Sequence, residues 1–101
     1  MIKVYGMPAC PYCAYVKTQI DGNPNFVYYD IGSDVHLLHQ FLDLRDTNPV
    51  FEPYKKEGDV GIPCFVLEDG RVTLEPSEVG LHSYSEVLHG KTACRIDGKG
   101  C

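Results

Sequence analysis

The sequence predicts an α/β fold in which a mixed four-stranded sheet is flanked by about three helices. Strand and helix patterns alternate over the first half of the chain, which is typical of parallel strands joined by a right-handed crossover. In the second half, Asp69-Gly70 separates two short apolar runs, and this pattern favours an antiparallel hairpin. The sheet should therefore contain both parallel and antiparallel pairs.

The first strand and helix are expected within the first 20 residues. Residues 1–5 alternate as a short strand does, and Gly6-Met7-Pro8 predicts a turn. Pro11 suits the first position of a helix, because its missing N–H would be unpaired there in any case. This places Cys10 at or beside the N-cap of a helix that runs to Ile20.

A second strand and a second helix follow. Residues 26–31 are rich in aromatic and branched side chains, which predicts a buried strand that ends at Gly32. Ser33 is a suitable N-cap, and Asp34 complements the positive end of the helix. The helix should reach about Arg45, with an apolar stripe made by Val35, Leu38, Phe41 and Leu42.

The second half of the chain begins without a clear period in its apolar residues. Residues 47–59 contain two prolines, so we expect a loop with a helical turn near residues 54–57. Residues 63–67 and 71–74 are the strands of the predicted hairpin. Residues 83–88 then predict a short final helix.

Length and composition fit one small globular domain. The 101 residues suffice for a single core, and the 44% hydrophobic and 23% charged fractions are ordinary for globular proteins. We place this domain at residues 1–90, followed by a cysteine-containing tail at residues 91–101 that should be loosely held.

Charge and hydropathy exclude some partners. A net charge of −5 argues against nucleic acid, which attracts clustered cations, and no stretch approaches the roughly 20 apolar residues of a membrane span. The first residues also contain no apolar run of signal-peptide length. We therefore expect a cytoplasmic monomer that binds neither nucleic acid nor a membrane.

Cys10 and Cys13 are the residues to which the sequence assigns chemistry. The thiolate reacts in disulfide exchange, and the positive end of a helix stabilises negative charge at Cys10. Cys13 lies one turn further in and should be more shielded. Cys10 would therefore attack a substrate disulfide, and Cys13 would resolve the resulting mixed disulfide. A zinc half-site is the alternative, but Cys94 and Cys101 lack the spacing of a second matching pair.

The Cys-Pro-Tyr-Cys segment at residues 10–13, with Lys17 in the same helix, resembles the active site of dithiol glutaredoxins, which have the thioredoxin-like fold. The predicted order of elements matches that fold over roughly residues 1–90. Ile62-Pro63 also resembles the cis-proline loop of the family. The resemblance implies a cis bond before Pro63, in a loop that faces Cys10.

The resemblance further implies a thiol-disulfide oxidoreductase that reduces protein disulfides or glutathione mixed disulfides. Glutathione is the implied reductant, and no tightly bound cofactor or metal is expected. Tyr12 would pack against the bound substrate, and the backbone of Ile62 beside Pro63 would pair with it as an added strand does. Ser83 would offer a hydroxyl group to glutathione.

The chain departs from the family pattern in its charged contacts. Met7 stands where glutaredoxins commonly carry a lysine that binds a carboxylate of glutathione, and Gly61 replaces the threonine that precedes the cis-proline segment. The acidic group that holds the amino end of glutathione is also missing. Lys55 or Lys56 is the candidate replacement for the lysine.

The remaining cysteines leave several interpretations open. Cys64 directly follows Pro63, and it is either a small core residue or a third redox thiol. Cys94 and Cys101 form a reversible tail disulfide, relay electrons to Cys10, or remain exposed thiols.

Two further functions compete with the oxidoreductase. One is an iron-sulfur or zinc binding module in which glutathione or Cys64 complements Cys10 as a ligand. The other is a redox sensor without turnover. His36 and His39 share a helix edge on which two metal ligands could lie, although a solvated face is the simpler interpretation.

Overall fold

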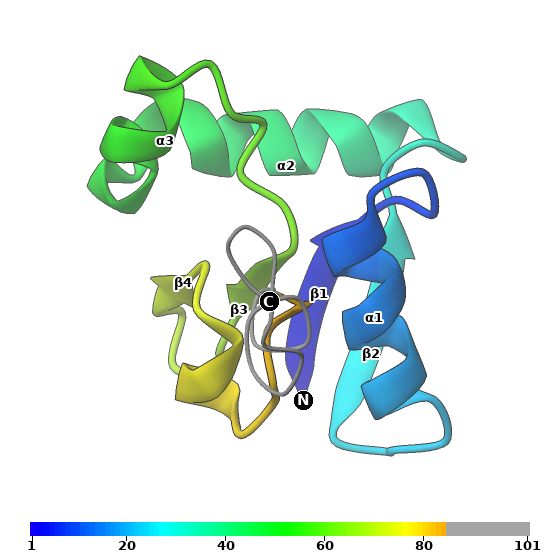
Figure 1. Cartoon of the computed structure of the whole chain (residues 1–101). Coiled ribbons are helices and arrows are strands. Elements are labelled where there is room, and N and C mark those ends of the chain that lie inside the picture. The colour runs from blue at the N-terminus through cyan, green and yellow to red at the C-terminus, as the bar shows by residue number, and fades with distance from the viewer. Residues whose placement is uncertain (85–101) are drawn as a thin grey trace, which may run out of the picture.

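Helices cover both faces of a mixed four-stranded sheet in the computed structural model, which describes residues 1–84 (Figure 1). The strands are β1 (Ile2–Gly6), β2 (Phe26–Asp30), β3 (Cys64–Val66) and β4 (Val72–Thr73). Their order in the sheet is β2-β1-β3-β4. β1 pairs in parallel with β2 and antiparallel with β3, and β3 pairs antiparallel with β4. The predicted mixed sheet and hairpin are therefore confirmed.

Three α-helices lie within residues 1–84: α1 (Pro11–Ile20), α2 (Val35–Thr47) and α3 (Glu52–Lys56). Two short 3₁₀ segments, η1 (Pro49–Phe51) and η2 (Pro76–Val79), complete the chain. None of the helices described is both long enough and apolar enough to cross a membrane. The tail and most of the helix predicted at 83–88, with Cys94 and Cys101, lie outside the described residues.

The predicted helix at residues 11–20 is confirmed at both ends. Cys10 is the N-cap, with an extended backbone (φ −92°, ψ 119°), and Pro11 begins the helix. The carbonyl of Cys10 accepts the first helical hydrogen bond from the N–H of Ala14 at 2.9 Å. At the other end, Asp21 N–H bonds to the Lys17 carbonyl at 3.0 Å. The N-cap position fixes Cys10 at the open end of α1.

The start of α2 differs from the prediction by one residue. Asp34 is the N-cap, and its carboxylate accepts a hydrogen bond from the N–H of His36 at 2.8 Å. Ser33, predicted as the cap, instead donates its hydroxyl to the carbonyl of Asp30 at 3.0 Å. The helix also continues past Arg45 to Thr47.

The apolar stripe predicted for α2 is partly wrong. Val35 is 60% exposed and Leu42 39% exposed, whereas Phe41 is fully buried. The side chains that pack against the core together with Phe41 are Leu37, Leu38 and Leu44. These residues recur at helical spacing on the face of α2 that lies toward the sheet. Val35 and Leu42 lie at the edge of that face or outside it.

The loop predicted at residues 47–59 is more ordered than expected. The side chain of Asn48 accepts a hydrogen bond from Val50 N–H at 3.0 Å and caps η1. Pro49 and Pro53 stand in the first turns of η1 and α3, where no backbone N–H is needed. The prolines therefore start helical segments here, and the fully buried Phe51 anchors them to the core.

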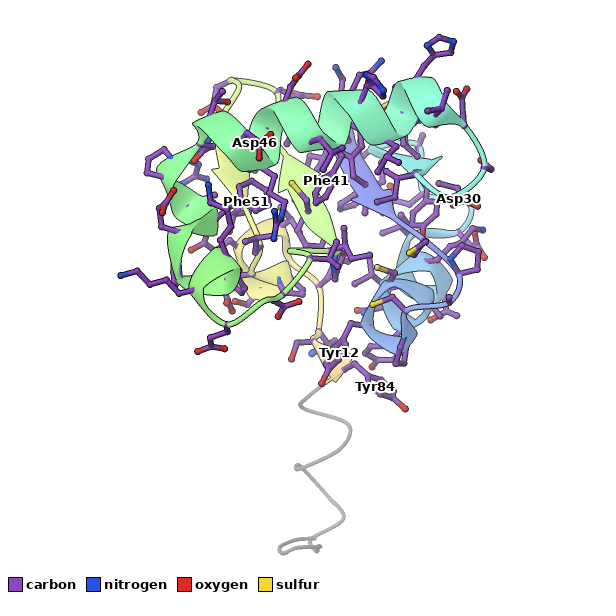
Figure 2. All side chains as sticks on the ribbon, turned by 90° about the horizontal axis from the view of Figure 1, so that it is seen from above. Tyr12, Asp30, Phe41, Asp46, Phe51 and Tyr84 are labelled. Atoms are coloured by element: carbon purple, nitrogen blue, oxygen red, sulfur yellow. The ribbon has the colours of Figure 1, made fainter. Side chains whose placement is uncertain are left out.

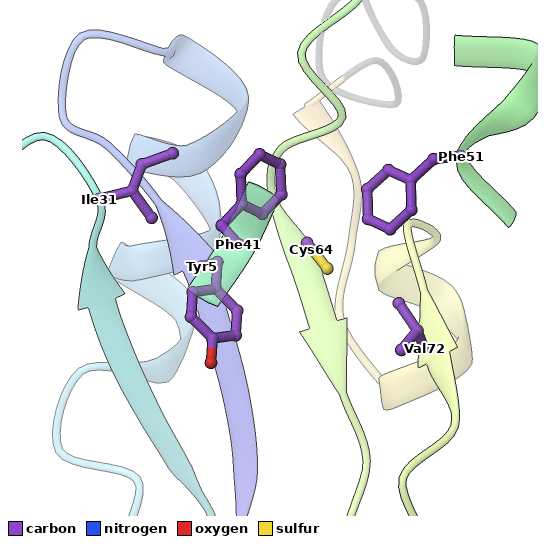
Figure 3. Close-up of a cluster of buried hydrophobic side chains, with 6 residues drawn as sticks. All are labelled: Tyr5, Ile31, Phe41, Phe51, Cys64 and Val72. Atoms are coloured by element: carbon purple, nitrogen blue, oxygen red, sulfur yellow. The ribbon is translucent and has the colours of Figure 1, made fainter. Parts of the chain in front are cut away.

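The core has two parts, one on each face of the sheet. Successive strand residues point to opposite faces, so Val4 packs against α1 while Tyr5 packs toward α2. On the α1 face, Val4 and Phe65 meet Val16 of the helix. The α2 face holds a cluster of Tyr5, Ile31, Phe41, Phe51, Cys64 and Val72 (Figure 3). The sheet thereby separates the surroundings of the two helices.

Candidate functional site

The two predicted reactive cysteines lie one helical turn apart but differ in exposure. Cys10 is half-buried at the open end of α1, and Cys13 is fully buried. Their side chains are hydrogen-bonded to each other. Cys10, Cys13 and Cys64 form no disulfide with one another.

Burial controls the protonation of Cys13. Removal from water, the largest cause, and the hydrogen bond with Cys10 together raise the pKa of the Cys13 thiol to about 12. A backbone hydrogen bond from Met7 acts in the opposite direction but is outweighed. Cys13 therefore keeps its proton at neutral pH, while Cys10 is the thiol that a solute can reach.

Gly6 at the end of β1 makes room for Cys13. A Cβ atom at Gly6 would lie 2.9 Å from Cys13 Sγ and 2.9 Å from the hydroxyl oxygen of Tyr28. Burial is the main cause that raises the pKa of Tyr28, so its hydroxyl also stays protonated. Gly6 and Tyr28 were predicted only as turn and strand residues. A glycine at a strand end, which often marks a close approach, was the available signal.

Cys10 opens into a groove of about 590 Å³. The groove runs between the start of α1, the loop before β3 and the segments that follow β4. The structure brings together there the site residues predicted from widely separated parts of the sequence, which are Cys10, Tyr12, Ile62, Pro63 and Ser83. The Ile62–Pro63 peptide bond is cis, as the resemblance implied.

Tyrosine rings form one wall of the groove. Tyr12 is 43% exposed, and its ring meets Tyr84 edge to face with centroids 5.4 Å apart. Figure 2 shows the two rings together at the edge of the molecule away from α2. Gln19 of α1 holds this segment by bonding both backbone groups of His82, at 2.7 and 2.8 Å. Tyr84 and Gln19 were not predicted as site residues, since their partners are more than 60 positions away in sequence.

The lysines proposed to replace the missing cation do not line the groove. Lys55 is paired with Glu52 of its own helix, with its Nζ 3.1 Å from the carboxylate. Lys56 is exposed on α3 and is also absent from the lining. Among the described residues, the charged side chains that line the groove are Asp59 and Glu75. This part of the lining is therefore negatively charged.

Cys64 lies in the core on the α2 face, away from the cysteine pair. It is fully buried among Phe41, Phe51 and Val72 (Figure 3). Burial raises the pKa of its thiol to about 12, so the thiolate is strongly disfavoured. This position favours the interpretation of Cys64 as a small core residue over that of a third redox thiol.

No group of three or more histidine, cysteine or acidic side chains is arranged to hold a metal ion within residues 1–84. His36 and His39 are exposed on α2, and Cys10 and Cys13 have no third metal-ligating neighbour among these residues.

The chain was also compared with protein-family models, with curated proteins and with solved structures, and no match was found in any of these comparisons.

Proposed function

We propose that this protein is a thiol-disulfide oxidoreductase of the glutaredoxin type, with a thioredoxin-like fold. One observation carries the proposal. A reachable thiol, Cys10, lies at a helix N-terminus on an open groove, and a fully buried thiol, Cys13, is hydrogen-bonded to it from one turn inside the helix. This is the arrangement that a two-step exchange needs, because one thiol must be accessible and the other held back.

In the first step, the thiolate of Cys10 attacks one sulfur of a substrate disulfide. A bond forms between Cys10 Sγ and that sulfur, the substrate S–S bond breaks, and the first product leaves as a thiolate that takes a proton from water. Cys10 is placed for this attack at the N-cap of α1, where its side chain reaches the groove.

In the second step, Cys13 loses its proton and attacks Cys10 Sγ. The mixed disulfide breaks, the second product leaves as a thiol, and a Cys10–Cys13 disulfide remains. The substrate gains two electrons, and the dithiol of the protein loses two. Because the pKa of Cys13 is about 12, this step needs proton transfer to the leaving thiolate or to water. A thiol reductant would then restore the dithiol.

The groove supports substrate binding beside Cys10. Tyr12 offers an exposed ring, and Ile62 and Pro63 line the same groove from the loop before β3. We propose that an extended substrate pairs with the backbone of Ile62. Ser83 lines the same groove from the end of the described chain.

The test is a single-turnover reaction of the pre-reduced protein with bis(2-hydroxyethyl) disulfide, a neutral substrate. Wild type should release two thiols for each protein that forms the Cys10–Cys13 disulfide. Cys10→Ser should release none from this site. Cys13→Ser should stop at the mixed disulfide on Cys10, visible as added mass on that peptide. Cys64→Ala serves as the control and should react as wild type does.

A Cys10→Ser variant that still reduces the disulfide at the wild-type rate would refute the proposal. Steady-state assays with glutathione and its reductase, or with thioredoxin reductase, then identify the electron donor. They need no further assumption about the site.

A further inference from the structure

The groove beside Cys10 carries negative charge that no described residue neutralises. Asp59 and Glu75 both line it and are both exposed. Within residues 1–84, neither carboxylate forms an ion pair, and no lysine, arginine or histidine lines the groove. A substrate that enters the groove therefore meets two uncompensated carboxylates.

Tyr54 lies close enough to Asp59 and Glu75 for the charge of each to act on its hydroxyl. Its hydroxyl donates a hydrogen bond to Glu75 Oε2 at 3.5 Å. Burial raises the pKa of Tyr54 most, and the charge of Glu75, its hydrogen bond and the charge of Asp59 raise it further. Tyr54 is thus a neutral side chain in a negative potential, between one carboxylate from the loop before β3 and one that follows β4.

The cation that binds the backbone of the loop before β3 does not line the groove. Arg45 of α2 donates its Nε to the Val60 carbonyl at 2.8 Å and its Nη2 to the Asp59 carbonyl at 2.7 Å. It does not line the groove. The guanidinium fixes the backbone of the loop through these carbonyl oxygens and forms no ion pair with the Asp59 carboxylate. Glu75 is the carboxylate that is hydrogen-bonded to a lining side chain, Tyr54, so it should contribute more to the potential at the substrate.

Aromatic side chains in the same groove favour the same sign of charge. Tyr12, Tyr54 and Tyr84 line it, and the face of an aromatic ring attracts a cation. An anionic substrate would instead bring its charge toward Asp59 and Glu75 and find no described cation to pair with. Glutathione carries two carboxylates and one ammonium group, so it is an anion, and we expect this groove to disfavour it.

We infer that the groove selects disulfides with an ammonium or guanidinium group close to the sulfur atoms, and that Glu75 and Asp59 determine this specificity. The inference rests on the proposed exchange reaction and adds its substrate class. Cys10 attacks such a disulfide in the two steps given above. The positive charge then lies near Glu75 while Cys10 attacks the adjacent disulfide.

The test compares three small disulfides in single turnovers of the pre-reduced protein: cystamine (cationic), bis(2-hydroxyethyl) disulfide (neutral) and 3,3′-dithiodipropionate (anionic). Each rate is divided by the rate of the same disulfide with free dithiothreitol, which removes intrinsic reactivity. We expect wild type to prefer cystamine over dithiodipropionate. The preference should shrink when salt rises from about 20 to about 500 mM.

Variants that each replace one carboxylate by a neutral amide identify the residues responsible for the preference. Glu75→Gln keeps an oxygen acceptor for Tyr54 and should lower the cystamine-to-dithiodipropionate ratio by about threefold to tenfold, as expected for a partly screened ion pair. Asp59→Asn should lower it less. Glu78→Gln is the matched control, because Glu78 is exposed, lies three residues from Glu75 and does not line the groove. It changes the net charge equally and should leave the ratio within about twofold.

A second pair of substrates distinguishes two sources of the cation. Cystine peptides with arginine beside the cysteine should be preferred over the same peptides with glutamate, if the charge is supplied by a polypeptide. A preference for cystamine alone would assign the groove to a small aminothiol disulfide.

The inference is wrong if Glu75→Gln and Asp59→Asn change the cystamine-to-dithiodipropionate ratio no more than Glu78→Gln does. In that case reduction of the neutral disulfide by wild type, and not by Cys10→Ser, would still support the proposed function. If the neutral disulfide fails to react with wild type, the proposed function itself is wrong.

Discussion

Cys10 and Cys13 have the same side chain, and their different surroundings make them different reagents. Cys10 occupies the N-cap, where helical N–H groups are unpaired and the groove gives access. Cys13 faces the sheet, where the absence of a side chain at Gly6 leaves space for its sulfur. Burial then raises the pKa of Cys13 to about 12. At the scale of single residues, the order of the two steps follows from these positions.

Alkylation should reveal this difference directly. In the native reduced protein at neutral pH, iodoacetamide should modify Cys10 at least about tenfold faster than Cys13 or Cys64, because both of these thiols are fully buried and protonated. Peptide mapping by mass spectrometry measures each rate. In denaturant the three rates should converge. Equal native rates for Cys10 and Cys13 would contradict the assigned roles.

Gly6→Ala should disturb Cys13 more than Cys10. The added methyl group would lie 2.9 Å from Cys13 Sγ, so we expect a loss of about 1–3 kcal/mol in the free energy of unfolding. The second exchange step should slow more than the first, so the mixed disulfide should accumulate. Urea unfolding and quenched mass spectrometry measure the two effects.

Gly32→Ala is the control for this variant. Its added Cβ would lie 3.1 Å from the end of the flexible Met7 side chain, which can move aside. If both variants lose the same stability and neither accumulates the mixed disulfide, the close approach at Gly6 has no role in the chemistry.

At the scale of elements, the sequence predicted best where a local rule decides. Pro11 can stand only near the start of a helix, so α1 was predicted at its exact bounds. Two adjacent candidates, Ser33 and Asp34, could each cap α2, and only the turn made by Asp30 and Ser33 decides between them. The helical segments after α2 were missed because the prolines were interpreted as breakers and the burial of Phe51 depends on long-range packing.

The loop before β3 contains a glycine that no other residue should replace. Gly61 has φ +93°, and a Cβ there would lie 2.8 and 2.9 Å from ring atoms of the buried Phe51. Both the positive φ and the close approach of Phe51 favour glycine at this position. Gly61→Ala should therefore lower the free energy of unfolding by about 2–4 kcal/mol, from backbone conformation and overpacking together.

Gly58→Ala isolates the backbone part of this cost. Gly58 has φ +76°, and an added Cβ would meet nothing within 4 Å. Its variant should lose only about 1 kcal/mol. Denaturant unfolding of both variants gives the difference, which measures the contact with Phe51. Equal losses would show that Phe51 moves aside at little cost.

At the scale of the whole molecule, the candidate site is assembled from segments that are far apart in sequence. The Cys-Pro-Tyr-Cys segment at 10–13 was predictable because its meaning is local, and Ile62, Pro63 and Ser83 came from the family resemblance. Asp59 and Glu75 carry no local signal, and they come together only because the hairpin returns the chain to the groove. The acidic character of the site therefore could not be predicted from sequence.

The buried thiols on the two faces of the sheet predict how the stability of the protein depends on pH. Cys13 on the α1 face and Cys64 on the α2 face both have thiol pKa values raised from 9.0 to about 12. An unfolded chain releases these protons near pH 9, whereas the folded chain retains them until about pH 12. The stability of the reduced protein should therefore be fully present below pH 9 and fall between about pH 9 and 12.

Cys64→Ala separates one of these thiols from the rest. It should lower the free energy of unfolding at pH 7 by about 1 kcal/mol, because a small void replaces the sulfur. Between about pH 9.5 and 10.5, however, its stability should fall less steeply than that of wild type, by up to about 1.4 kcal/mol per pH unit. Urea unfolding with a phosphine reductant measures both slopes. The raised pKa values of Tyr28 and Tyr54 steepen both curves alike, so they cancel in the comparison. The charge of Cys64 contributes to the raised pKa of Tyr5, so its loss in the variant makes the two slopes differ in the same direction. Parallel curves would mean that Cys64 ionises in the folded protein as readily as in the unfolded chain, which its burial between α2 and the sheet argues against.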